Sequence, residues 1–164
     1  MTLITSQTLH DLALCERRAW LSAADSARAD DVPLSVGVVW ERAADGALEA
    51  REAATWADAV ALTERLMGLG AASIFGACLE VREPLDLSDR VFTIRVRIDR
   101  LERIAHLGEA AYAPVLTRDR SEAVEADGLV LDLWVWALDA LNGAPPPAEL
   151  WLGVDELGRA RRRI

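Results

Sequence analysis

Residues 91–99 constrain the fold of this chain more than any other stretch. Apolar side chains there alternate with polar or charged ones: Phe92, Ile94, Val96 and Ile98 alternate with Thr93, Arg95, Arg97 and Asp99. A period of two residues is typical of a β-strand with one apolar face. A short loop around Gly108 follows, and then a second β-like run over 112–118. Residues 91–118 therefore predict a β-hairpin in which Asp99 points to the same face as the arginines.

The other periodic stretches predict helices and strands that pack around this hairpin. Helices are expected over residues 5–25, 36–51, 55–68 and 121–141, and strands over 71–81 and 149–153. Thr55 is a candidate N-cap for the third helix, and residues 129–141 of the last helix are apolar nearly all round, so they should be buried on most sides. A mixed, largely antiparallel sheet covered by helices is the most economical packing of these elements.

Length and composition favour one globular domain. The chain has 164 residues, of which 52% are hydrophobic and 27% are charged. That composition is unlike the composition of disordered chains. We expect a single domain over 1–155 and a basic, solvated tail over 156–164. No apolar run is long enough to span a bilayer and the first residues lack the pattern of a signal peptide, so a cytoplasmic protein with no membrane association is expected.

The charge balance opposes general attraction to nucleic acid. The formal net charge is −9, and all 18 basic residues are arginine. Binding to a phosphate backbone would therefore need a local basic patch. Arginine also cannot easily give up its proton, so no site in this chain can use a neutral amine as a base. Cys15 and Cys78 are too few to form a zinc or iron–sulfur ligand set alone and are expected to be buried thiols, and His10 and His106 form no ligand pair.

Several stretches taken together resemble one nuclease family. Residues 14–18 read Leu-Cys-Glu-Arg-Arg behind a Thr-Ser cap, residues 37–41 read Gly-Val-Val-Trp-Glu, Asp99 lies at the end of the first hairpin strand, and residues 132–136 read Asp-Leu-Trp-Val-Trp. These stretches resemble the RecB-like nucleases of the PD-(D/E)XK superfamily, which include the CRISPR-associated exonucleases of RecB type. The resemblance covers most of the chain. It implies a restriction-endonuclease-like α/β (α+β) fold, in which a mixed β-sheet is flanked by helices.

The resemblance also assigns roles to individual positions. Family members are expected to hold Mg²⁺ or Mn²⁺ with an aspartate, a second carboxylate and often a histidine, while a lysine positions the attacking water. The matching positions in this chain are Asp99 for the aspartate, Leu116 for the second carboxylate, Trp40 for the histidine and Arg118 for the lysine. Asp132 and Trp136 stand where the family carries its Q-x-x-x-Y motif. Cys15 matches the first cysteine of the family's iron–sulfur cluster, but no cysteine follows Cys78, so no cofactor is expected unless Mg²⁺ or Mn²⁺ binds to an active protein.

These substitutions weaken the implied chemistry. Leucine supplies no ligand, indole has no lone pair for a metal, and arginine is a poor proton acceptor. We therefore expect a catalytically inactive pseudo-nuclease, which serves as a binding or structural module with DNA or a nucleic-acid-processing protein as its partner. Its oligomeric state is open.

Two alternative functions stay open. The chain would be an active metal-dependent DNA exonuclease if its ligands had migrated to Glu41, Glu80 or Asp132. It would be a protein-interaction scaffold without a nucleic-acid role if the net negative charge prevents the protein from binding phosphate.

Two further observations have purely structural interpretations. Asp99 would equally suit a solvated strand face with an ion pair to a neighbouring arginine, and Trp40, Trp134 and Trp136 suit core packing better than base stacking.

Overall fold

The computed structural model describes residues 3–4, 36–41, 46–84, 91–104, 111–142, 144–153 and 162–163. In chain order the elements are β1 (Leu3–Ile4), β2 (Val36–Glu41), β3 (Leu48–Ala53), α3 (Trp56–Gly68), β4 (Ser73–Pro84), β5 (Val91–Arg103), β6 (Tyr112–Arg118), α4 (Glu125–Asn142), β7 (Glu149–Leu152) and β8 (Arg162–Arg163). The helix predicted over 5–25 lies outside the described residues, as do Cys15, His10 and His106.

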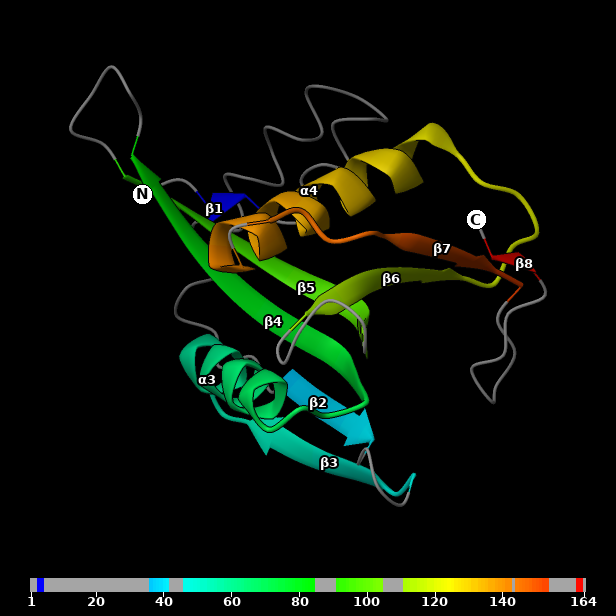
Figure 1. Ribbon diagram of the computed structural model, residues 1–164. Helices are drawn as coiled ribbons and strands as arrows, with labels where there is room; N and C mark the ends of the chain where they lie inside the picture. Colours follow the sequence, from blue (N-terminus) through cyan, green and yellow to red (C-terminus); the bar gives the residue numbers. More distant parts are fainter. Residues whose placement is uncertain are drawn as a thin grey trace.

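All the described strands belong to one mixed sheet of eight strands, shown in Figure 1. The strand order is β3-β2-β4-β5-β6-β7-β8, and β1 lies beside β5. The β1–β5 and β6–β7 pairs are parallel, while the other pairs are antiparallel. Helix α3 packs on β2, β3 and β4, and α4 packs on β4, β5 and β6. The predicted α/β (α+β) class, with a mixed and largely antiparallel sheet flanked by helices, is confirmed.

The hairpin predicted over 91–118 is present as β5 and β6. Its two strands pair from Arg100↔Val115 to Arg103↔Tyr112, and β5 pairs along most of its length with β4 on its other side. Helix α4 connects β6 to β7, and these two strands are parallel. A parallel pair requires such a crossover, because a tight turn cannot bring the chain back in the same direction.

The helix predicted over 36–51 is wrong, because this stretch forms most of the β2–β3 hairpin. The two strands pair without interruption from Val36↔Ala53 to Glu41↔Leu48. Residues 48–53 read Leu-Glu-Ala-Arg-Glu-Ala, which are mostly strong helix formers. Pairing of β2 with both β3 and β4 overrides that local preference. Trp40 therefore lies on a strand, at the register position opposite Ile74 of β4.

Helix α3 begins and ends where the sequence predicted. The Thr55 hydroxyl accepts a hydrogen bond from the Asp58 N–H at 3.2 Å, and the Asp58 carboxylate accepts one from the Thr55 N–H at 3.1 Å. This reciprocal pair is a capping box, which satisfies two backbone donors that the first turn leaves without helical partners. The N-cap assigned to Thr55 is therefore confirmed.

The buried face of the β4–β5 strand pair changes part-way along the two strands. The Leu79↔Val96 pair and the Ile74↔Leu101 pair are all 0% exposed. Side chains five positions apart on a strand point to opposite faces, so the two pairs are buried on opposite sides of the sheet. Gly76 lies between them with φ 64, in the left-handed region that glycine enters without steric cost. The alternation predicted over 91–99 therefore does not continue to Leu101, which is buried on the opposite face.

Buried Thr63 of α3 completes the hydrogen bonding of β4 where β2 no longer pairs with it. The β2–β4 ladder covers Ser73 to Phe75 on β4. Further along β4, the N–H of Cys78 donates to Thr63 Oγ1 at 3.0 Å, and that hydroxyl donates to the Ala59 carbonyl at 2.9 Å. One side chain thus satisfies a buried backbone donor and ties α3 to the sheet.

Replacing Thr63 with valine should therefore destabilise the fold. Valine has the same shape but no acceptor, so the Cys78 N–H would be left buried and unsatisfied, at a cost of about 1–3 kcal/mol. Urea unfolding measures the loss, and hydrogen exchange of the Cys78 amide identifies its origin. The control is Thr63→Ser, which keeps the hydroxyl and should keep that amide protected. Equal exchange rates in the two variants would contradict this role of the hydroxyl.

Candidate functional site

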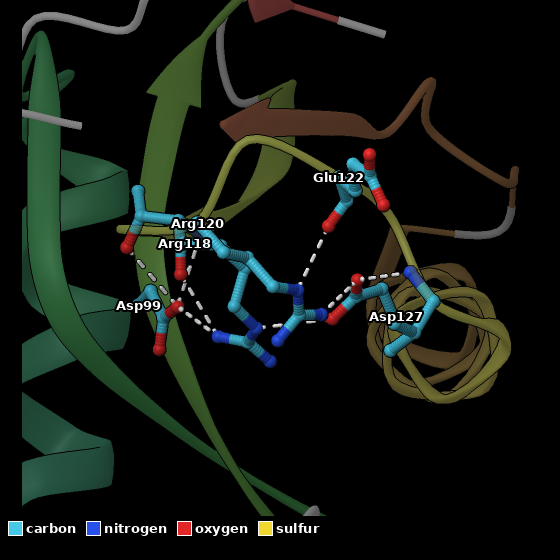
Figure 2. Close-up of polar contacts among 7 residues, drawn as sticks. Asp99, Arg118, Arg120, Glu122 and Asp127 are labelled. Carbon is cyan, nitrogen blue, oxygen red and sulfur yellow. Dashed lines mark hydrogen bonds and ion pairs between the residues drawn. The ribbon is translucent and has the colours of Figure 1, made fainter. Parts of the chain in front are cut away.

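Asp99 lies at the point where β5 and β6 stop pairing. The ladder between the two strands extends only from Arg103 to Arg100 on β5. One residue further, Asp99 Oδ2 accepts hydrogen bonds from the Thr117 N–H at 3.1 Å and from the Thr117 hydroxyl at 3.2 Å (Figure 2). A side-chain carboxylate therefore bridges the two strands just beyond the end of the backbone ladder.

Arg118 brings a positive charge to the same carboxylate oxygen. Its Nη1 lies 3.4 Å from Asp99 Oδ2 and also donates to the Thr117 carbonyl at 2.8 Å. Its Nε donates to Asp127 Oδ1 of α4 at 3.0 Å. The Arg118 guanidinium, with its side chain 26% exposed, thus bridges a carboxylate on the sheet and a carboxylate on the helix (Figure 2).

Asp127 is the most buried member of this group, with a side chain that is 3% exposed. Besides Arg118, it accepts hydrogen bonds from Nη2 of Arg120 and from the N–H of Val124, the latter at 3.0 Å. Burial alone would raise the pKa of Asp127, but the hydrogen bonds from Arg120, Val124 and Arg118 outweigh burial and hold this pKa below its ordinary value. Asp127 is therefore a buried, charged carboxylate that depends on its arginines.

The same aspartate fixes the start of α4. The predicted helix over 121–141 begins too early, because α4 begins at Glu125. Val124 has no side-chain acceptor to cap the first turn, and Asp127 reaches back to its N–H instead. Sequence reasoning missed this residue. The signal available was an acidic residue in the first turn of the helix, three positions after Val124, a place where carboxylates are favoured.

Asp99, Arg118, Asp127 and Arg120 thus form a chain of alternating negative and positive groups, called the arginine–carboxylate network below (Figure 2). Arg120 is its outer end: its side chain is 38% exposed, and its Nε donates to the Glu122 carbonyl at 2.8 Å. Two arginines balance two aspartates, so the four charged groups sum to zero. The structure brings together Asp99 and Arg118, which the sequence had singled out, and adds two residues that the sequence had not.

These residues do not fit the Mg²⁺ or Mn²⁺ site that the resemblance implies. Leu116 is 0% exposed and pairs in register with Leu150, so its position belongs to the core. Asp99 offers an oxygen that already accepts three hydrogen bonds, one of them from a cation. Mg²⁺ needs near-octahedral oxygen ligands and repels a guanidinium. Within the described part of the chain, no group of three or more His, Cys, Asp or Glu residues could hold a metal ion.

Two of the three candidate migrated ligands, Glu80 and Asp132, lie elsewhere or point away. The Glu80 carboxylate is 2.9 Å from Arg95 and 3.1 Å from Arg82, and although burial alone would raise its pKa, these arginines lower it. Its partner Arg95 is about 13 Å along β5 from Asp99, at ~3.3 Å per residue. Asp132 is exposed on α4 and lies about 140° around the helix from Asp127. Glu41 pairs with Ser73 in the backbone register, and its side chain is not described.

The tryptophans of α4 differ in depth. Trp134 is 2% exposed and lies in the core, as predicted. Trp136 is only partly buried and packs against the core cluster from outside. Leu129 and Leu141 are exposed, so the expectation that residues 129–141 are buried on most sides is only partly correct. Trp136 therefore belongs to the margin of the core.

Cys78 is buried and unpaired, as the sequence predicted. Burial raises the pKa of its thiol to about 11, against the weaker opposing effect of Arg97. At neutral pH this group is a thiol, which is a poor nucleophile and metal ligand. Within the tail predicted over 156–164, the backbone of Arg162 and Arg163 forms β8 against β7.

Comparison with known proteins assigns neither a family nor a function. No protein-family model matches the chain, and no curated protein matches its sequence. Among solved structures, the crystal structure of SSO0001 is similar to this chain with a TM-score of 0.41 and 12% sequence identity. The match covers 92% of this chain and 61% of that one, so the chain spans less than two thirds of the length of SSO0001. None of the helices in the described residues is long and apolar enough to cross a membrane.

Proposed function

We propose that this chain is a pseudo-nuclease of the RecB-like type, in which the arginine–carboxylate network has replaced the metal site. In this proposal the protein does not cleave DNA. It acts as a non-catalytic binding or structural module, with DNA or a nucleic-acid-processing protein as its partner. The family rests on the sequence motifs, and the loss of catalysis rests on the contacts of Asp99 and Arg118.

The observation that carries the proposal is the position of the Arg118 guanidinium between Asp99 and Asp127. It lies 3.4 Å from the first carboxylate and 3.0 Å from the second. A divalent cation that bridged the same two groups would meet a fixed positive charge in its place, and expelling Arg118 would also unpair the buried Asp127. Arginine at this position therefore supplies the charge that the carboxylates need, but it supplies no activated water and no proton acceptor.

An alternative without any nucleic acid is a scaffold that binds only protein. The net charge of −9 favours it, because an acidic surface repels phosphate at low ionic strength. The active-exonuclease alternative is weaker, since Glu80 is held by two arginines and Asp132 is directed away from Asp127.

The decisive experiment is a cleavage assay with the purified protein. We expect linear single- and double-stranded DNA, labelled at one end, to stay intact with Mg²⁺ or Mn²⁺ at neutral pH. Leu116→Glu alone and Arg118→Lys alone should also be inactive, because the family's ligands and lysine act as a unit. Calorimetric titration with Mn²⁺ should detect no site of micromolar affinity.

Asp99→Ala is the control for contaminating nuclease. Cleavage by the wild type that disappears in Asp99→Ala would overturn the pseudo-nuclease proposal and favour the active exonuclease. The triple variant Trp40→His/Leu116→Glu/Arg118→Lys tests whether all three substitutions must be reversed together. DNA binding measured by fluorescence anisotropy, at low salt and without metal, tests DNA as the partner, because binding under these conditions would contradict the scaffold alternative.

A further inference from the structure

Strand β3 ends the sheet with an exposed edge. It is the first strand in the order β3-β2-β4-β5-β6-β7-β8, and β2 is its only partner among the described strands. Leu48 at its start is 64% exposed, and Ala50, Arg51 and Glu52 are exposed as well. Figure 1 shows β3 at one margin of the molecule, on the far side of β2 from the rest of the sheet. One row of its backbone groups therefore faces outward.

Two of the usual protections of a sheet edge are missing from β3. Natural edge strands are commonly blunted by proline, charged side chains, a bulge or a covering segment. β3 contains no proline, and all six of its residues pair with β2 without a bulge, so its protection is the charge of Glu49, Arg51 and Glu52. The side chains of residues 48 and 50–52 are exposed, and among the described strands only β2 pairs with β3. An edge of this kind is a template for another strand.

The charges of β3 are complementary to themselves in one antiparallel register. If two copies of the strand pair about a two-fold axis through Ala50, Glu49 of each copy lies opposite Arg51 of the other, and Ala50 lies opposite Ala50. Opposite charges at directly opposed positions stabilise antiparallel pairs, and like charges there destabilise them. A two-fold axis between antiparallel strands must pass through a pair of identical residues, because facing side chains lie on the same face of the sheet. An axis at Glu49, Arg51 or Glu52 would place two like charges opposite each other. The charge pattern thus selects the register centred on Ala50.

We propose that β3 pairs with β3 of a second copy of this chain, in the register centred on Ala50, so that the sheet continues through a two-fold dimer. A C2 contact uses the same surface patch on both subunits, and the Glu49–Arg51 pair appears twice in it. Leu48 of one copy packs against the methylenes of Glu52 of the other. The buried area of one short strand pair is small, so the dimer is weak and forms in a concentration-dependent way.

Sedimentation velocity over a concentration series tests this dimer with charge variants. The wild type should shift from monomer to dimer as its concentration rises. Arg51→Glu and Glu49→Arg should each weaken the self-association by about tenfold or more, because both place like charges opposite each other twice per dimer. The double variant Glu49→Arg/Arg51→Glu restores opposite charges and should recover the association of the wild type.

Mixing the two single variants provides the sharpest readout. Arg51→Glu makes both positions negative and Glu49→Arg makes both positive, so an equimolar mixture should form a heterodimer although each variant associates only weakly alone. Because Glu49 also has a contact within its own chain, thermal melting must show that Glu49→Arg is folded. A wild type that stays monomeric, single variants that associate as the wild type does, or a mixture that does not associate would each overturn the proposal.

Discussion

Replacing Asp127 with alanine should destabilise the protein by about 3–5 kcal/mol, the range seen when one partner of a buried ion pair is removed. The carboxylate is 3% exposed and accepts hydrogen bonds from two arginines and from the first turn of α4. Its loss would leave Arg118 and Arg120 without a common anion and would leave the Val124 N–H without its acceptor. Urea unfolding followed by circular dichroism measures the change. The matched control is Asp132→Ala on the exposed side of the same helix, which should change stability by less than about 0.5 kcal/mol.

Acid unfolding gives a second readout of the same residue. Because the folded-state pKa of Asp127 is below its ordinary value of 3.8, the unfolded chain binds this proton more readily than the folded chain. The contribution to stability is therefore present above the unfolded pKa and is lost as the pH falls through the folded pKa. Stability of the wild type should fall below about pH 4, and that fall should be shallower in Asp127→Ala. Glu80 acts in the same direction, so part of the fall will persist. Identical pH profiles for the two proteins would contradict the charged state assigned to Asp127.

Replacing Trp134 with alanine should cost about 3–5 kcal/mol, like other large deletions in a core. The indole is 2% exposed and belongs to the core cluster. The deletion leaves a cavity that the rigid sheet beneath it cannot fill by small movements. Urea unfolding of the variant and of the wild type measures the loss in the free energy of unfolding.

Trp136 is the matched control for this deletion, since it has the same side chain two positions along α4. It is only partly buried, so Trp136→Ala should cost clearly less than Trp134→Ala. The sequence alone predicted core packing for both tryptophans, because they lie in the same apolar run. A loss for Trp136→Ala that equals or exceeds the loss for Trp134→Ala would contradict the deeper burial of Trp134.

The candidate site could be predicted only in part. Asp99 was identifiable because it ends a regular alternation on a strand, and its contact with a neighbouring arginine was among the expectations. That this arginine is Arg118 depends on how β5 and β6 diverge beyond their ladder. Asp127 lies 28 positions after Asp99 in the chain, and only the packing of α4 on β6 brings the two within reach of one guanidinium.

The sequence by itself determined the elements whose signals are local. The alternation in 91–99 specified a strand, and Thr55 with Asp58 specified the start of α3, because a pleat and a capping box involve residues close together in the chain. Tertiary structure alone decided that residues 48–53 form a strand against their helix propensity. These residues pair with β2, and β2 is itself held in the sheet by β4. Tertiary structure also decided that Val96 and Leu101, which point to opposite faces of β5, are both buried. Local patterns specify conformation within a few residues, whereas burial depends on which distant segments cover them.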